Sequence, residues 1–121
     1  MTILTLALKR PPLTSNDQRR AHWTTVRKAK ADVELLVRAA AREAKTAPVG
    51  PCSVEIIWWA PDARIRDSDS LGPFLKASLD ALVRCGVLAR DDYRHVLGTT
   101  TRIAIDRVNP RIEIHLKETA A

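Results

Sequence analysis

The sequence predicts a single α+β domain with two helices packed on a mixed sheet, in the order β-α-β-α-β-β. Two long segments repeat apolar residues at helical spacing, three short segments alternate apolar with polar residues, and a fourth is apolar on both faces. A length of 121 residues is enough for one hydrophobic core but not for two. No internal repeat, low-complexity tract or linker interrupts the chain. We therefore expect residues 1–121 to form one unit.

The first half of the chain predicts strand, loop, helix and strand. Residues 2–8 alternate well enough for a strand, and two consecutive prolines end it. The polar residues 13–20 predict a loop. From about residue 23 to residue 45 apolar side chains recur at helical spacing without Gly or Pro. Residues 53–60 then predict a strand that is apolar on both faces, which suits a central position in the sheet.

The second half predicts a helix followed by a hairpin. Residues 73–85 give the helix, with Pro73 in its first turn and Gly86 just after its end. Lys76, Asp80 and Arg84 form one polar stripe on it. Two alternating segments, residues 101–106 and 111–116, are joined by a short turn, so we expect them to pair as a hairpin.

The charge balance favours an anionic partner. The chain has 20 Lys and Arg against 14 Asp and Glu, and its pI is near 9.9. Nucleic acid is the first expectation, and an anionic membrane surface the weaker one. No apolar run approaches the roughly 18 residues of a membrane span, and residues 1–8 lack the features of a signal peptide. Cys52 and Cys85 are far apart, which predicts free thiols in the cytoplasm and no zinc site.

Acidic side chains gather between residues 62 and 92, close to arginines. Asp67 and Asp69 follow the predicted central strand and are two residues apart. In extended backbone their Cα atoms would lie about 7 Å apart with both side chains on one side, so both carboxylates would reach the same one or two metal ions. Asp91 or Asp92 is the candidate third ligand. Carboxylates bind Mg²⁺ and basic residues attract phosphodiesters, so this segment predicts a metal-dependent nuclease site.

Simpler interpretations exist for each of these residues. Asp69 or Ser70 is well placed to cap the helix that follows. The Asp91-Asp92 pair is also typical of an ordinary polar turn. Lys76 is one helical turn from Asp80, where an exposed lysine commonly forms a solvated ion pair.

Taken in order, these motifs resemble the RusA family of Holliday junction resolvases, the crossover junction endodeoxyribonucleases of phages and prophages. The resemblance runs from about residue 5 to residue 117. The matching residues are Pro11-Pro12-Leu13-Thr14-Ser15-Asn16 with His22, then Asp67-Ser68-Asp69-Ser70-Leu71 with Lys76, then Asp80-Ala81-Leu82, Gly86 and Asp91-Asp92.

The resemblance implies a small homodimeric, Mg²⁺-dependent endonuclease that resolves four-way DNA junctions in recombination and repair. Mn²⁺ would be a possible substitute metal, and the cytoplasm of a bacterium or phage-infected host the compartment. Asp67, Asp69 and Asp92 match the family's metal-binding catalytic carboxylates, and Lys76 matches its catalytic lysine. The residues expected to contact nucleic acid are Arg64, Arg66, Asn16, Arg19, Arg20 and His22.

The chain departs from the family pattern at two places. Ser70 stands where the family usually has Asn, and Gly72-Pro73-Phe74 resembles a three-residue insertion. Pro73 predicts a helix that begins late enough to keep Lys76 in its first turn, facing the metals. For the dimer we expect an interface that includes Trp58 or Trp59 with Phe74 and Leu82.

Two other classes of protein fit parts of the sequence. One is a RusA-like DNA-binding protein with little catalytic activity. The other is a small basic interaction module without nuclease ancestry, such as an RNA-binding or toxin–antitoxin protein.

Overall fold

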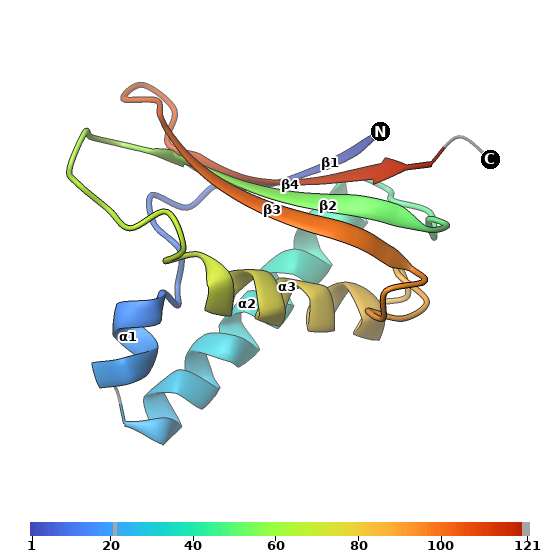
Figure 1. Ribbon diagram of the computed structural model, residues 1–121, viewed down its shortest axis with the longest axis horizontal. Helices are drawn as coiled ribbons and strands as arrows, with labels where there is room; N and C mark the ends of the chain where they lie inside the picture. The colour runs from blue at the N-terminus through green and yellow to red at the C-terminus, as the bar shows by residue number, and fades with distance from the viewer. Residues whose placement is uncertain (21, 120–121) are drawn as a thin grey trace.

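A computed structural model describes residues 1–20 and 22–119, except for the side chain of Arg20. It confirms an α+β domain: a four-stranded mixed sheet has the helices on one of its faces (Figure 1). The elements in chain order are β1 (Thr2–Leu6), α1 (Ser15–Arg20), α2 (Trp23–Glu43), β2 (Cys52–Ala60), α3 (Gly72–Arg84), β3 (Val96–Ile105) and β4 (Arg111–Glu118).

The strand order is β1-β4-β2-β3, so the predicted C-terminal hairpin is wrong. β3 pairs in parallel with β2, whereas β4 pairs antiparallel with β2 on the other side. The β2-α3-β3 segment is a crossover unit, which brings β3 beside β2 in parallel. β2 is therefore central, with β3 on one edge and β4 on the other. The connection passes the end of β2, where the backbone N–H of Asp106 donates to the carbonyl of Ala60 (2.9 Å).

The core lies between the helices and the sheet. α2 contributes Val33 and Val37, and α3 packs against it with Phe74 and Leu82, both fully buried. Trp58 on β2 is also in this core. The expectation that Trp58, Phe74 or Leu82 forms a dimer interface is therefore wrong, because one domain is enough to bury them.

Trp59 lies on the opposite face of the sheet and is half-buried. Its indole N–H donates to Glu113 Oε1 (2.8 Å), and the Arg111 guanidinium stacks 4.8 Å from its ring centre. Burial of Glu113 favours the neutral acid, but hydrogen bonds from Trp59, His115 and Arg111 outweigh that effect and lower its pKa.

The segment predicted as a loop before the long helix contains α1. Thr14 and Asp17 bond reciprocally at its start: Thr14 Oγ1 accepts from the Asp17 N–H (3.3 Å), and Asp17 Oδ2 accepts from the Thr14 N–H (3.1 Å). These contacts satisfy two of the N–H groups that a helix start leaves unpaired. The polar residues 13–20, predicted as a loop, therefore include the cap and the first turn of a helix.

α3 begins at Gly72, earlier than expected, with the proline in its first turn. Lys76 therefore lies in the second turn, and its predicted first-turn position is wrong. A turn at residues 67–70 leads directly into the helix, so Gly72-Pro73-Phe74 becomes its first turn.

Cys52 and Cys85 are free thiols, with Cys85 at the end of α3, as predicted. None of the helices in the described residues is both long enough and apolar enough to cross a membrane.

Candidate functional site

Two of the motifs that carry the family resemblance, residues 11–16 and residues 67–71, meet in space. The backbone N–H of Ser15, at the start of α1, donates to the carbonyl of Ser70 (3.1 Å). The Ser15 hydroxyl donates to the carbonyl of Asp69, 54 residues away (3.4 Å). Thr101 on β3 holds the same segment from the other side through the carbonyl of Ser68 (3.4 Å). The acidic loop is thus tied to both α1 and the sheet.

Asp67 and Asp69 lie in a turn and not on extended backbone, so the predicted extended geometry is wrong. The N–H of Ser70 donates to the carbonyl of Asp67 (3.1 Å), and the N–H of Gly72 donates to that of Asp69 (3.2 Å). Both aspartates are exposed, and neither carboxylate pairs with a described side chain or backbone group. Leu71 occupies the N-cap position of α3 and no side chain caps it, so the capping interpretation of Asp69 and Ser70 is wrong.

Lys76 is paired with other acidic groups. Its Nζ lies 3.1 Å from Asp80 Oδ1 and 3.0 Å from Asp91 Oδ2. The hydrogen bond to Asp91 and then that to Asp80 raise the pKa of Lys76 above its usual value. The solvated pair with Asp80 is therefore present. Asp91, which sequence reasoning considered only as a metal ligand or a turn residue, is its second partner.

Asp92 organises the turn before β3. Its Oδ1 accepts from the backbone N–H groups of Arg94 (3.1 Å) and His95 (3.2 Å), and His95 Nδ1 lies 2.6 Å from the same oxygen. The His95 contact is the main reason that the pKa of Asp92 is lowered. The polar-turn interpretation of this segment is confirmed, and one of the two carboxylate oxygens already has three contacts.

The acidic residues do not form one metal cage in this conformation. Within the part of the chain that the structure describes, no group of three or more His, Cys, Asp or Glu side chains is arranged to hold a metal ion. Asp67 and Asp69 have the hard oxygen ligands that Mg²⁺ prefers. A site that also includes Asp92 requires the turn at residues 91–95 to approach them.

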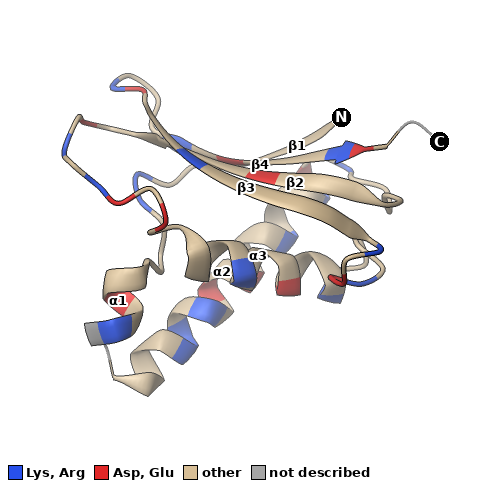
Figure 2. Ribbon diagram, in the orientation of Figure 1, with Lys and Arg blue, Asp and Glu red and all other residues tan. Residues whose placement is uncertain are grey.

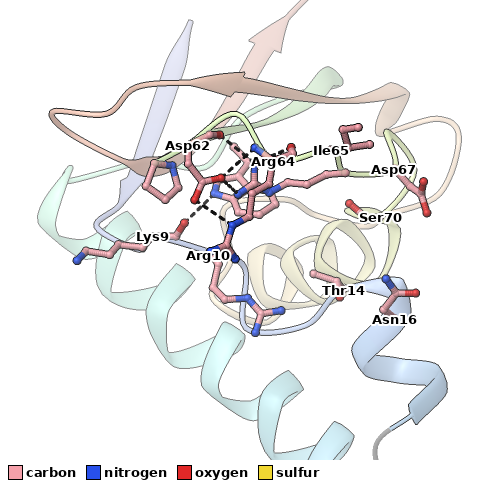
Figure 3. Close-up of a pocket in the computed structure, with 12 residues that line it drawn as sticks. Lys9, Arg10, Thr14, Asn16, Asp62, Arg64, Ile65, Asp67 and Ser70 are labelled. Atoms are coloured by element: carbon pink, nitrogen blue, oxygen red, sulfur yellow. Dashed lines mark hydrogen bonds and ion pairs between the residues drawn. The ribbon is translucent and has the colours of Figure 1, made fainter.

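A cavity of about 580 Å³ adjoins Asp67 (Figure 3). It lies between the segment after β1 and the loop after β2, and Ser70 is in its wall. Four basic residues line it against two acidic ones. The lining residues are Lys9, Arg10, Thr14, Asn16, Trp58, Pro61, Asp62, Arg64, Ile65, Arg66, Asp67 and Ser70.

The two arginines of the loop differ in availability. The Arg66 guanidinium stacks on Trp58, 4.7 Å from the ring centre, and donates to Asp62 Oδ1 at 2.6 Å. Only 17% of its side chain is exposed, so Arg66 mainly holds the loop. Arg64 is 84% exposed, with Nε 3.7 Å from Asp62 Oδ2, and remains accessible to a ligand. Asp62, which the sequence did not single out, positions both arginines.

The other predicted nucleic-acid contacts are dispersed. Asn16 lines the cavity and accepts a hydrogen bond from Arg19. His22 caps α2 by accepting from the Thr24 N–H, so its ring has a local structural role. The side chain of Arg20 lies outside the described residues. Basic residues also follow the exposed side of α2 (Figure 2).

Sequence reasoning missed Lys9 and Arg10 at the cavity. The sequence signal was that these two basic residues come directly before Pro11-Pro12. Two consecutive prolines stiffen the backbone, so the basic pair stays close to the end of the first strand.

Neither a protein-family model nor a curated protein matches this chain.

Proposed function

We propose that this protein is a Mg²⁺-dependent endonuclease that resolves four-way DNA junctions by paired phosphodiester hydrolysis. The observation that carries the proposal is the contact between residues 11–16 and residues 67–71. Ser15, at the start of α1, donates hydrogen bonds to backbone carbonyls of the turn that carries Asp67 and Asp69. The carboxylates of these two aspartates have no partner among the described residues. In a chain of net charge +6, two such carboxylates beside a basic cavity favour a divalent cation as their partner.

Asp67 and Asp69 would hold the metal, and Asp92 would join as the third carboxylate. A bound Mg²⁺ supplies a water of lowered pKa and neutralises charge on the leaving oxygen. Lys76 would stabilise charge on the scissile phosphate, which requires it to exchange its Asp91 contact for the phosphate. The pair with Asp91 is largely solvent-exposed, so this exchange costs little.

Two symmetric cuts in one junction require two sites, and a two-fold homodimer supplies them. The buried positions of Trp58, Phe74 and Leu82 mean that the dimer must use other surfaces.

A catalytically weak DNA-binding protein is the second candidate. The observation that favours it is the pairing of Lys76 with Asp80 and Asp91, together with the contacts that already hold Asp92. If these contacts persist on DNA, the basic surface remains while the catalytic arrangement is lost.

A synthetic four-way junction tests both candidates. With Mg²⁺ the protein is expected to produce paired nicks at symmetric positions, and chelation of the metal is expected to stop them. A linear duplex of one arm sequence is the control substrate. A junction-selective gel shift without nicking supports the DNA-binding protein. If the protein neither shifts nor nicks the junction, both candidates are contradicted.

A further inference from the structure

The cavity beside Asp67 is lined by basic residues, and two of those with exposed side chains belong to a segment to which the proposed function gives no role. Lys9 and Arg10 follow β1, and Arg64 approaches from the loop after β2 (Figure 3). Arg66 already stacks on Trp58 and pairs with Asp62. The positive charge available to a ligand therefore comes from two segments more than 50 residues apart in the chain.

Both segments are held in place, the first by the sheet and the second by a contact within its own loop. The Trp58 indole N–H donates to the backbone carbonyl of Lys9 (3.0 Å), which fixes this segment against β2. Asp62 accepts from the backbone N–H of Arg64 (3.1 Å) and so fixes the backbone of the opposite wall. The positions from which the basic side chains extend are thus set before any ligand binds, which lowers the entropy cost of binding.

The polar groups in the cavity point to an anion. Arg10 contacts Asp17 at 2.9 Å, but the Arg10 side chain is 62% exposed, so this pair is weak and readily replaced by a stronger anion. The Ser70 hydroxyl in the wall is buried and has no hydrogen-bond partner in the described residues. This oxygen is closed to solvent, so the exposed charge of Arg10 is what a ligand in the cavity meets.

We propose that this cavity binds a phosphate ester through Lys9, Arg10 and Arg64. The ligand we infer is a backbone phosphate of DNA, held close to Asp67. The choice of DNA over a free nucleotide rests on the proposed function, whereas phosphate binding by the cavity does not.

The indole of Trp58 gives a local readout, because its N–H lies at the cavity wall. The chain has three tryptophans, so a ¹⁵N–¹H spectrum has three indole signals at most. Trp59 is half-buried on the opposite sheet face and serves as the internal control, whereas Trp23 is exposed among basic residues of α2 and does not. Trp23→Phe and Trp59→Phe assign the signals by elimination.

The probes are tetrathymidylate, thymidine monophosphate and inorganic phosphate, each titrated without Mg²⁺. We expect tetrathymidylate to shift the Trp58 signal at lower concentration than either small probe. Thymidine monophosphate binding as tightly as the oligonucleotide overturns the DNA assignment. A Trp58 signal that moves no more than that of Trp59 with every probe overturns the site itself.

Charge removal supplies the second measurement. Lys9→Ala and Arg10→Ala are each expected to weaken tetrathymidylate binding about threefold and to reduce its salt dependence by about one charge. Lys117→Ala and Arg42→Ala are the matched controls, since both residues are exposed and lie outside the cavity. Equal weakening in the controls means a general charge effect and contradicts the site.

Junction cleavage separates this inference from the proposed function. If the Trp58 signal responds but junctions are never cut, the phosphate site stands and the nuclease fails. If Lys9→Ala/Arg10→Ala cuts junctions at the parental rate and affinity, the nuclease stands and the phosphate site fails.

Discussion

Replacing Asp69 with Asn is expected to separate DNA binding from DNA cutting. The carboxylate is exposed and lacks a protein partner among the described residues, so its loss removes no contact that stabilises the fold. A unit charge about 8 Å from a phosphate is repelled by about 0.5 kcal/mol in water, and salt near 0.1 M roughly halves this. With two such phosphates nearby, Asp69→Asn should bind a junction about twofold more tightly.

The cleavage rate of Asp69→Asn should fall, and by far more than its binding affinity rises. Loss of one metal-binding carboxylate is expected to lower the cleavage rate by about 100-fold or more, because charge on the reacting phosphate is no longer neutralised. Gel shift and cleavage are measured on the same labelled junction, with binding measured without metal so that the carboxylate charge is not offset by a cation. Asp32→Asn, which removes an exposed carboxylate from α2, is the matched control. Parental cleavage by Asp69→Asn would refute a metal role for this residue.

Metal binding can be followed without activity through the amide signals of the protein. Mn²⁺ at substoichiometric concentration should broaden the signals of residues 67–70 first, because paramagnetic broadening falls steeply with distance. Broadening that also covers residues 91–95 and disappears in Asp92→Asn supports Asp92 as a third ligand. No preferential broadening at either segment would contradict the metal site.

Four further outcomes are expected. Phe74→Ala should lower the free energy of unfolding in urea by about 3–5 kcal/mol. If this loss is the same at every protein concentration, Phe74 acts in the core and not in a dimer interface. The pKa of Glu113 is lowered in the folded protein, so its ionised carboxylate stabilises the fold above the usual carboxyl range and this stability should be lost as the pH falls through the lowered pKa. The Glu113→Gln variant should therefore lose less stability on acidification than the parent. Ser70→Ala should leave stability unchanged or raise it by up to about 1 kcal/mol, because it removes an unpaired buried hydroxyl. Asp91→Asn should lower the pKa of Lys76, measured from its side-chain ¹⁵N signal, and an unchanged pKa would contradict the observed pair.

The sequence determined the elements that depend on local spacing. Apolar residues at helical intervals and an uninterrupted apolar strand are visible in a short window, so α2, β2 and α3 could be predicted to within a few residues. The order of the motifs also identified Asp67 and Asp69 as candidates. These features require only that neighbouring residues share a face.

Tertiary structure decided which segments became neighbours. The alternating C-terminal segments suggested a hairpin, but β2 had two edges to pair and separated β3 from β4. Whether Lys76 meets Asp67 or Asp91 depends on where α3 begins and where the chain returns, which spacing along the sequence does not specify. Lys9 and Arg10 became part of a cavity only because Trp58 fixes their backbone to the sheet. Contacts between distant segments reflect the packing of the whole core, so no local pattern encodes them.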